Sequence, residues 1–82
     1  NKYPQVLINT SVSNDKKSDF YMNDIIKDNI ERVENILGEN GRVLVRPSGT
    51  EPLIRVMLEG KDKELIEKYA KELANVIVKE LN

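Results

Sequence analysis

A strand-like pair of segments joined by a proline-bounded loop most constrains how this chain can fold. In Leu53–Glu59 an aliphatic residue recurs at every second position, at 54, 56 and 58, which is the period of a strand. Arg42–Arg46 is a short run of β-branched and apolar residues between two arginines. The connection, Pro47–Pro52, has a proline at either end, and each proline fixes its own backbone φ angle. The whole segment is therefore predicted to be a stiff hairpin.

The alternation also predicts which side chains share a face of the sheet. Ile54, Val56 and Leu58 fall on one side of their strand, and this apolar side is expected to face a core. Arg55 and Met57 alternate with them and are expected on the opposite side, away from any covering helix.

One more strand is predicted near the start of the sequence. Gln5–Val12 places β-branched residues on one side and Leu7, Asn9 and Ser11 on the other. The polar stretch that follows, Ser13–Ser18, is predicted to be a loop.

Two amphipathic helices are predicted from apolar residues at helical spacing. The first begins after Asn23, which can cap it, and ends at Gly38, which suits a left-handed cap. The second begins after Asp62 and continues to the end of the sequence. The apolar stripes comprise Ile26, Ile30, Val33 and Leu37 in the first helix, and Ile66, Tyr69, Ala70, Leu73, Ile77 and Leu81 in the second.

The element order β-α-β-β-α predicts an α+β fold, with two helices on one face of a mostly antiparallel sheet. The other face would be open to solvent or to a partner domain. Residues 1–82 are enough for one small domain and too few for two.

Composition excludes several functions. The 13 basic and 14 acidic residues give a formal net charge of −1, and aromatic residues make up 5% of the chain, with none on a predicted strand. Neither feature suits a nucleic-acid module or attraction to an anionic membrane. Cysteine and histidine are absent, so no catalytic residue and no metal ligand is predicted in this chain. No apolar run approaches the ~20 residues that span a membrane, and a cytoplasmic location is expected.

The loop and its flanks gather groups that bind phosphate. Ser48 and Thr50 supply hydroxyls, and Gly49 allows backbone conformations closed to other residues, so that successive amides can form an anion-binding nest. Arg46 lies at one rim and Arg55 on the returning strand, and a guanidinium matches phosphate oxygens bidentately, as lysine cannot. Together these residues predict a phosphate cradle.

Two plainer interpretations fit the same residues. A Pro-Ser-Gly-Thr segment between strands is often only a tight surface loop. Arginines at strand ends are often solvated, or paired with an acid such as Glu51 or Glu59. The residues by themselves leave these alternatives open.

The segment Arg46-Pro-Ser-Gly-Thr-Glu-Pro52, continued by Leu53-Ile-Arg-Val-Met57, closely resembles the phosphate-binding signature of the α-D-phosphohexomutase superfamily. With Tyr3-Pro-Gln5, it is most similar to the bacterial branch that acts on glucosamine phosphates. The alternative is a phosphomannomutase or phosphoglucomutase. The phosphomannomutase branch often has Asn where Gly49 stands, so glycine favours the glucosamine branch.

The resemblance implies the fourth, C-terminal domain of a longer enzyme, of which this chain would be a fragment, with a fold like that of the TATA-box-binding protein. It implies an intramolecular phosphotransferase, an isomerase, that interconverts glucosamine 6-phosphate and glucosamine 1-phosphate for the amino sugars of peptidoglycan. The reaction would run through a bisphosphorylated intermediate and a phosphoserine on the first domain, with Mg²⁺ on the second and a sugar-recognition loop on the third. This domain would hold the phosphate that is not being transferred, and alone it should be inactive.

The same resemblance implies the roles of five binding residues. Arg46 and Arg55 match phosphate-binding arginines. Ser48, Gly49 and Thr50 match loop ligands that act through hydroxyls and amides.

Three supporting residues complete the expected site. Glu51 is expected to orient an arginine, because a carboxylate beside a phosphate would repel it, while Pro47 and Pro52 stiffen the loop. The expected partners are a phosphosugar and the other domains of the same enzyme, with no nucleic acid and no membrane.

Overall fold

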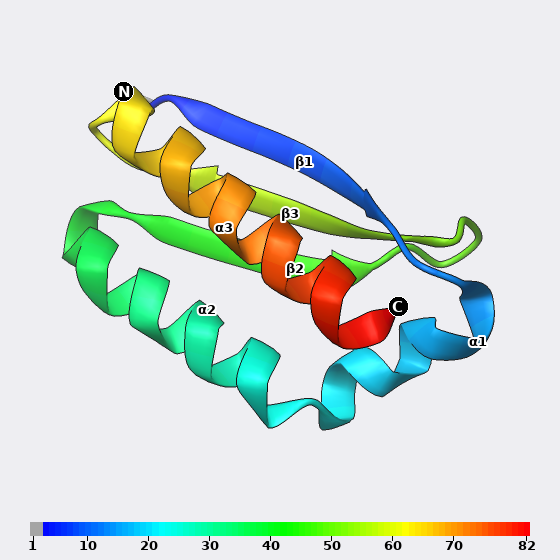
Figure 1. The fold of residues 1–82 in the computed structure, drawn as a ribbon. Helices are drawn as coiled ribbons and strands as arrows, with labels where there is room; N and C mark the ends of the chain where they lie inside the picture. Colours follow the sequence, from blue (N-terminus) through cyan, green and yellow to red (C-terminus); the bar gives the residue numbers. More distant parts are fainter. Residues whose placement is uncertain (1–2) are drawn as a thin grey trace.

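The sheet consists of three antiparallel strands in the order β1–β3–β2, with β3 in the centre. The computed structural model describes residues 3–82, and its two long helices, α2 and α3, lie on the same face of this sheet (Figure 1). The elements are β1 (Gln5–Ser11), α1 (Asn14–Lys17), η1 (Ser18–Met22), α2 (Asp24–Leu37), η2 (Gly38–Asn40), β2 (Arg42–Pro47), β3 (Leu53–Glu59) and α3 (Lys63–Leu81). The predicted α+β class, with an antiparallel sheet and two covering helices, is confirmed.

Strand β3 fixes the register of both neighbours. Its last residue, Glu59, lies opposite Gln5 of β1 on one side and Arg42 of β2 on the other. Residues that share such a cross-strand row project from the same face of the sheet. The two faces can therefore be followed along all three strands from this one row.

The helix-covered face forms the core. Ile54, Val56 and Leu58 of β3 have no exposed surface, as the alternation predicted. Each such aliphatic side chain contributes about 1.5–3 kcal/mol when it is fully buried. The buried side chains packed against them are Val12, Phe20, Ile26, Val33, Ile66, Ala70, Leu73, Ile77 and Leu81. Most of the predicted helix stripes are in this core, and Ile30, Leu37 and Tyr69 pack at its edge.

The opposite face of the sheet carries no helix. Leu7 of β1 is 60% exposed and Leu44 of β2 is 43% exposed. Arg55 is also exposed and Met57 is half-buried. The predicted phase of β3 is confirmed, and we call this side the open face.

The predicted caps delimit the helices. The Asn23 side chain accepts a hydrogen bond from Ile26 N at 2.9 Å, and the Asp62 carboxylate accepts one from Leu65 N at 3.2 Å. Such a cap contributes about 1 kcal/mol. Gly38 ends α2 with φ 69° and ψ −158°. Its φ is positive as predicted, but this ψ lies outside the left-handed helical region, in a conformation confined essentially to glycine.

The prediction of a loop at Ser13–Ser18 is wrong. The Ser13 carbonyl accepts hydrogen bonds from Lys16 N at 3.0 Å and Lys17 N at 3.1 Å, which closes the short helix α1. The η1 turn follows and places Phe20 in the core, where it is 7% exposed. Burial of this aromatic ring stabilises the helical conformation of a segment whose own residues are nearly all polar.

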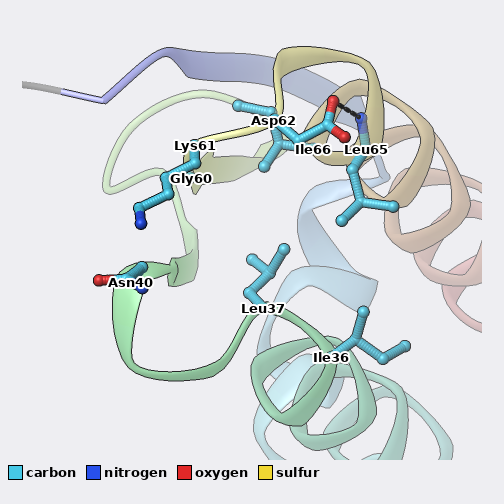
Figure 2. A pocket seen from close by; sticks show the side chains of 8 residues that line it. All are labelled: Ile36, Leu37, Asn40, Gly60, Lys61, Asp62, Leu65 and Ile66. Carbon is cyan, nitrogen blue, oxygen red and sulfur yellow. Dashed lines mark hydrogen bonds between the residues drawn. The ribbon is translucent and has the colours of Figure 1, made fainter.

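A shallow hollow of about 150 Å³ lies at the end of the sheet away from the β2–β3 loop, where α2 ends and α3 begins (Figure 2). Its lining is mainly aliphatic, from Ile36, Leu37, Leu65 and Ile66. The nearby Asp62 carboxylate is used by the α3 cap. The hollow therefore belongs to the packing of this turn.

No helix in the described part of the chain is long and apolar enough to cross a membrane.

Thr10 carries an unsatisfied polar group into the core. It is 4% exposed, and within residues 3–82 its hydroxyl oxygen has no hydrogen-bond partner. Thr10→Val keeps the shape and removes the hydroxyl, so we expect the free energy of unfolding to rise by about 1 kcal/mol. For a domain of this size the melting temperature would rise by about 5 °C.

Thr10→Ser is the matched control, because it keeps the hydroxyl and removes the methyl group. We expect this variant to melt below the parent chain. A lower melting temperature for Thr10→Val would show that the hydroxyl is satisfied in solution.

Candidate functional site

Residues 48–52 connect β2 to β3 at one end of the sheet. The last β2 residue, Pro47, lies opposite Ile54, and Ser48 N donates a hydrogen bond to Leu53 O at 3.0 Å. Pro47 thus belongs to the strand, one residue beyond the predicted end. Strand β2 lies at the edge of the sheet, where a residue without an N–H group is tolerated.

Among the described residues, hydrogen bonds within the loop hold the end that leads into β3 and do not involve the amides of its tip, Gly49 and Thr50. The Ser48 hydroxyl oxygen accepts from Glu51 N at 3.2 Å, and Glu51 O accepts from Leu53 N at 2.8 Å. Across the described residues, the successive amides of Gly49 and Thr50 have no hydrogen-bond partner, and both residues are exposed. The tip therefore presents two adjacent N–H donors beside the Thr50 hydroxyl.

The two arginines meet on the open face. Arg46 of β2 lies directly opposite Arg55 of β3 in the register. Directly opposed residues in an antiparallel pair have Cβ atoms about 4.5–5.5 Å apart. The predicted site residues of the strands are thus brought together, two residues before the loop in β2 and three residues after it in β3.

The charge of this pair is poorly compensated. The Glu51 carboxylate lies 3.9 Å from the Arg55 guanidinium, and both side chains are more than half exposed. Within residues 3–82, Arg46 has no carboxylate within 4.0 Å. By contrast, Arg32 on α2 contacts Glu72 on α3 at 2.9 Å. The arginine pair on the open face therefore forms a concentrated positive site suited to an anion.

Apolar side chains border the pair. A shallow hollow of about 310 Å³ on the open face is lined by Leu7, Leu44, Arg46, Arg55 and Met57. Guanidiniums beside an apolar surface are less well hydrated than those in open water, and this strengthens their hold on an anion.

Gly49 does not adopt a left-handed conformation in this structure. Gly38 is the glycine with a positive φ among the described residues, so Gly49 does not use the region of positive φ that favours glycine. A Cβ at Gly49 would also meet no protein atom within 4 Å. The loop itself does not require glycine here. Close approach by a ligand remains the predicted reason for it.

Lys17 is a residue near the site that the sequence patterns did not single out. Its ammonium donates a hydrogen bond to Glu51 O at 2.9 Å. The contact joins residues 34 positions apart. A lysine in a short polar stretch carries no periodicity that would predict it.

Comparisons with known proteins identify the family of this chain. The model of the phosphoglucomutase/phosphomannomutase C-terminal domain family matches residues 7–76, and the chain belongs to this family. The chain is similar to phosphoglucosamine mutase of Clostridioides difficile (strain 630), at 53% identity over 81 residues, which are 99% of this chain and 18% of that protein. It is 54% identical over 80 residues to phosphoglucosamine mutase of Thermoanaerobacter sp. (strain X514), covering 98% of this chain and 18% of that protein. The predicted family is confirmed, and the chain spans less than a fifth of these relatives.

A solved structure shares the fold. The crystal structure of Aspergillus fumigatus N-acetylphosphoglucosamine mutase in complex with GlcNAc-6P and magnesium matches with a TM-score of 0.79. The identity is 22%, over 98% of this chain and 16% of that one. Among residues 3–82 of the present chain, no three His, Cys, Asp or Glu side chains lie together as a metal site would need.

The arginine pair predicts a local gain of stability when one charge is removed. Like charges that lie directly opposite each other in a sheet destabilise it. Arg46→Thr is expected to raise the free energy of unfolding in urea by about 0.5 kcal/mol at low ionic strength. The gain should vanish in 1 M NaCl, where the Debye length is about 3 Å.

Arg42→Thr is the matched control in the same strand. Arg42 lies opposite Glu59 in the register, so its removal takes away a positive charge that faces a carboxylate and should not raise stability. Equal losses of stability in both variants would show that the two guanidiniums do not repel each other measurably.

Proposed function

We propose that residues 1–82 form the C-terminal, phosphate-holding domain of a bacterial phosphoglucosamine mutase. The observation that carries the proposal is the arginine pair. Arg46 and Arg55 lie opposite each other on the open face, next to a loop tip with free amide donors at Gly49 and Thr50. The relatives at 53% and 54% identity are phosphoglucosamine mutases, which favours this branch over a phosphomannomutase or phosphoglucomutase.

The longer enzyme would interconvert glucosamine 6-phosphate and glucosamine 1-phosphate. Its C-terminal domain would hold the phosphate that is not being transferred, through two bidentate guanidiniums. Because the intermediate carries two phosphates, each would occupy this site in turn. The phosphoserine, the Mg²⁺ ion and the sugar-recognition loop would lie on other domains, and the chain alone should show no mutase turnover in a coupled assay.

The loop residues have distinct parts in this proposal. The Ser48 and Thr50 hydroxyls and the amides of Gly49 and Thr50 would donate to phosphate oxygens. Glu51 would hold Arg55 in place, since its carboxylate lies 3.9 Å from that guanidinium. The flanking prolines, Pro47 and Pro52, would lower the entropy lost when the loop closes on the ligand.

Location and partners follow from the same proposal. An enzyme that makes cell-wall amino sugars from phosphosugars would work in the cytoplasm. Its partners would be the phosphosugar and the other domains of the same enzyme.

Titration with inorganic phosphate, followed by amide chemical shifts, tests the proposal. We expect shifts at Ser48, Gly49 and Thr50 and a roughly millimolar dissociation constant, about −4 kcal/mol. Charge-assisted hydrogen bonds contribute about 1.5–3 kcal/mol each, but binding must offset the lost freedom of ligand and loop. Affinity should weaken with added salt, because the site is exposed.

Variants separate shape recognition from charge. Arg46→Lys should weaken phosphate binding nearly as much as Arg46→Ala, because the planar guanidinium, and not its charge alone, recognises the phosphate oxygens. Thr50→Val should cost less affinity than either change. If the shifts instead fall on the lysines of α3 and not on the loop, the loop is not the phosphate site.

A further inference from the structure

The segment that follows β1 is hydrogen-bonded to the loop at two successive carbonyls. Val12 N donates to Pro52 O at 3.0 Å, and Lys17 Nζ donates to Glu51 O at 2.9 Å. We call residues 12–17 the strap. Because the strap donates hydrogen bonds to both carbonyls, it fixes the position of the loop residues that lead into β3.

The residue that Lys17 contacts, Glu51, is the centre of the hydrogen bonds within the loop. Glu51 O also accepts from Leu53 N at 2.8 Å, and Glu51 N donates to the Ser48 hydroxyl oxygen at 3.2 Å. A change in the position of Glu51 would therefore move both of its backbone polar groups and disturb the Ser48 hydroxyl as well. Lys17 therefore contacts the loop at Glu51, between the exposed tip and the residues that lead into β3.

Lys17 also adds positive charge on the strap side of the loop. An ammonium has three donors, and the Glu51 carbonyl uses one of them. Lys17 is half-buried against the loop, whereas its neighbour Lys16 on the same short helix is exposed. A cation on α1 thus contacts the loop that connects the strands of Arg46 and Arg55.

We infer that Lys17 is a positioning residue of the phosphate site. It holds the Glu51 peptide so that the Ser48 hydroxyl and the free amides at the tip keep the arrangement that receives phosphate. Its charge adds to the attraction for the anion. This inference rests on the proposed function and extends it to a residue outside the loop and its strands.

The test compares Lys17→Gln with Lys16→Gln in titrations with inorganic phosphate. Both variants lose one positive charge from the same helix, so they are matched in net charge. We expect Lys17→Gln to raise the dissociation constant about threefold, the effect of a partly exposed charge, and Lys16→Gln to leave it unchanged. Without phosphate, the amide signals of Glu51 and Leu53 should move in Lys17→Gln alone.

Lys17→Arg provides the rescue. It keeps the charge and a donor for the Glu51 carbonyl, so its phosphate affinity should return to that of the parent chain. Melting temperatures measured alongside ensure that each titration is made on folded protein.

Two failures can be told apart. If the parent chain binds phosphate at the loop but Lys17→Gln binds it equally well, the proposed function stands and the role of Lys17 is wrong. Equal weakening by Lys16→Gln would also overturn that role, because net charge alone would then explain the effect. If the parent chain shows no phosphate shifts at the loop, the proposed function and this inference both fail.

Discussion

The antiparallel pairing of β2 with β3 is the constraint on which the rest of the structure depends. Its register places Arg46 opposite Arg55 and leaves only residues 48–52 to join the strands. The same register puts Ile54, Val56 and Leu58 under the helices. A slip of one residue would turn the arginines into the core and the aliphatic side chains into solvent. The core and the candidate site therefore specify the register together.

The two faces of the sheet have different roles. The covered face carries the apolar burial that stabilises so small a domain. The open face carries a pair of like charges beside apolar side chains, an arrangement that is expected to reduce stability locally. An anion held between the guanidiniums would offset this cost. The expected repulsion between the two arginines and the proposed phosphate binding thus both follow from their opposed positions on the open face.

Much of this could be predicted from local sequence patterns. Alternation in Leu53–Glu59 gave the face of Arg55, and a polar residue before each apolar stripe gave the caps at Asn23 and Asp62. These features depend on residues close together in the chain. The loop residues could be selected for phosphate chemistry, because arginine, serine, glycine and threonine differ from the lysine-rich remainder.

The parts that were missed depend on contacts between distant segments. Residues 13–18 read as a loop because their own side chains are polar, yet burial of Phe20 and the Lys17 contact with Glu51 fold them into a short helix. The conformation of Gly49 was also missed, because a glycine in a sequence does not reveal whether it uses its freedom. Tertiary contacts determine the fold of residues 13–18, and no local pattern encodes those contacts.

Membership of the phosphoglucomutase/phosphomannomutase C-terminal domain family gives the chain its context, and the arginine pair with the free loop tip gives a physical account of phosphate binding. The most direct test is a crystal structure of the chain grown with millimolar phosphate. The account predicts one phosphate in contact with both guanidiniums and with the Gly49 and Thr50 amides, at donor–oxygen distances of about 2.7–3.0 Å. A phosphate bound elsewhere, with Arg46 and Arg55 left in solvent, would contradict it.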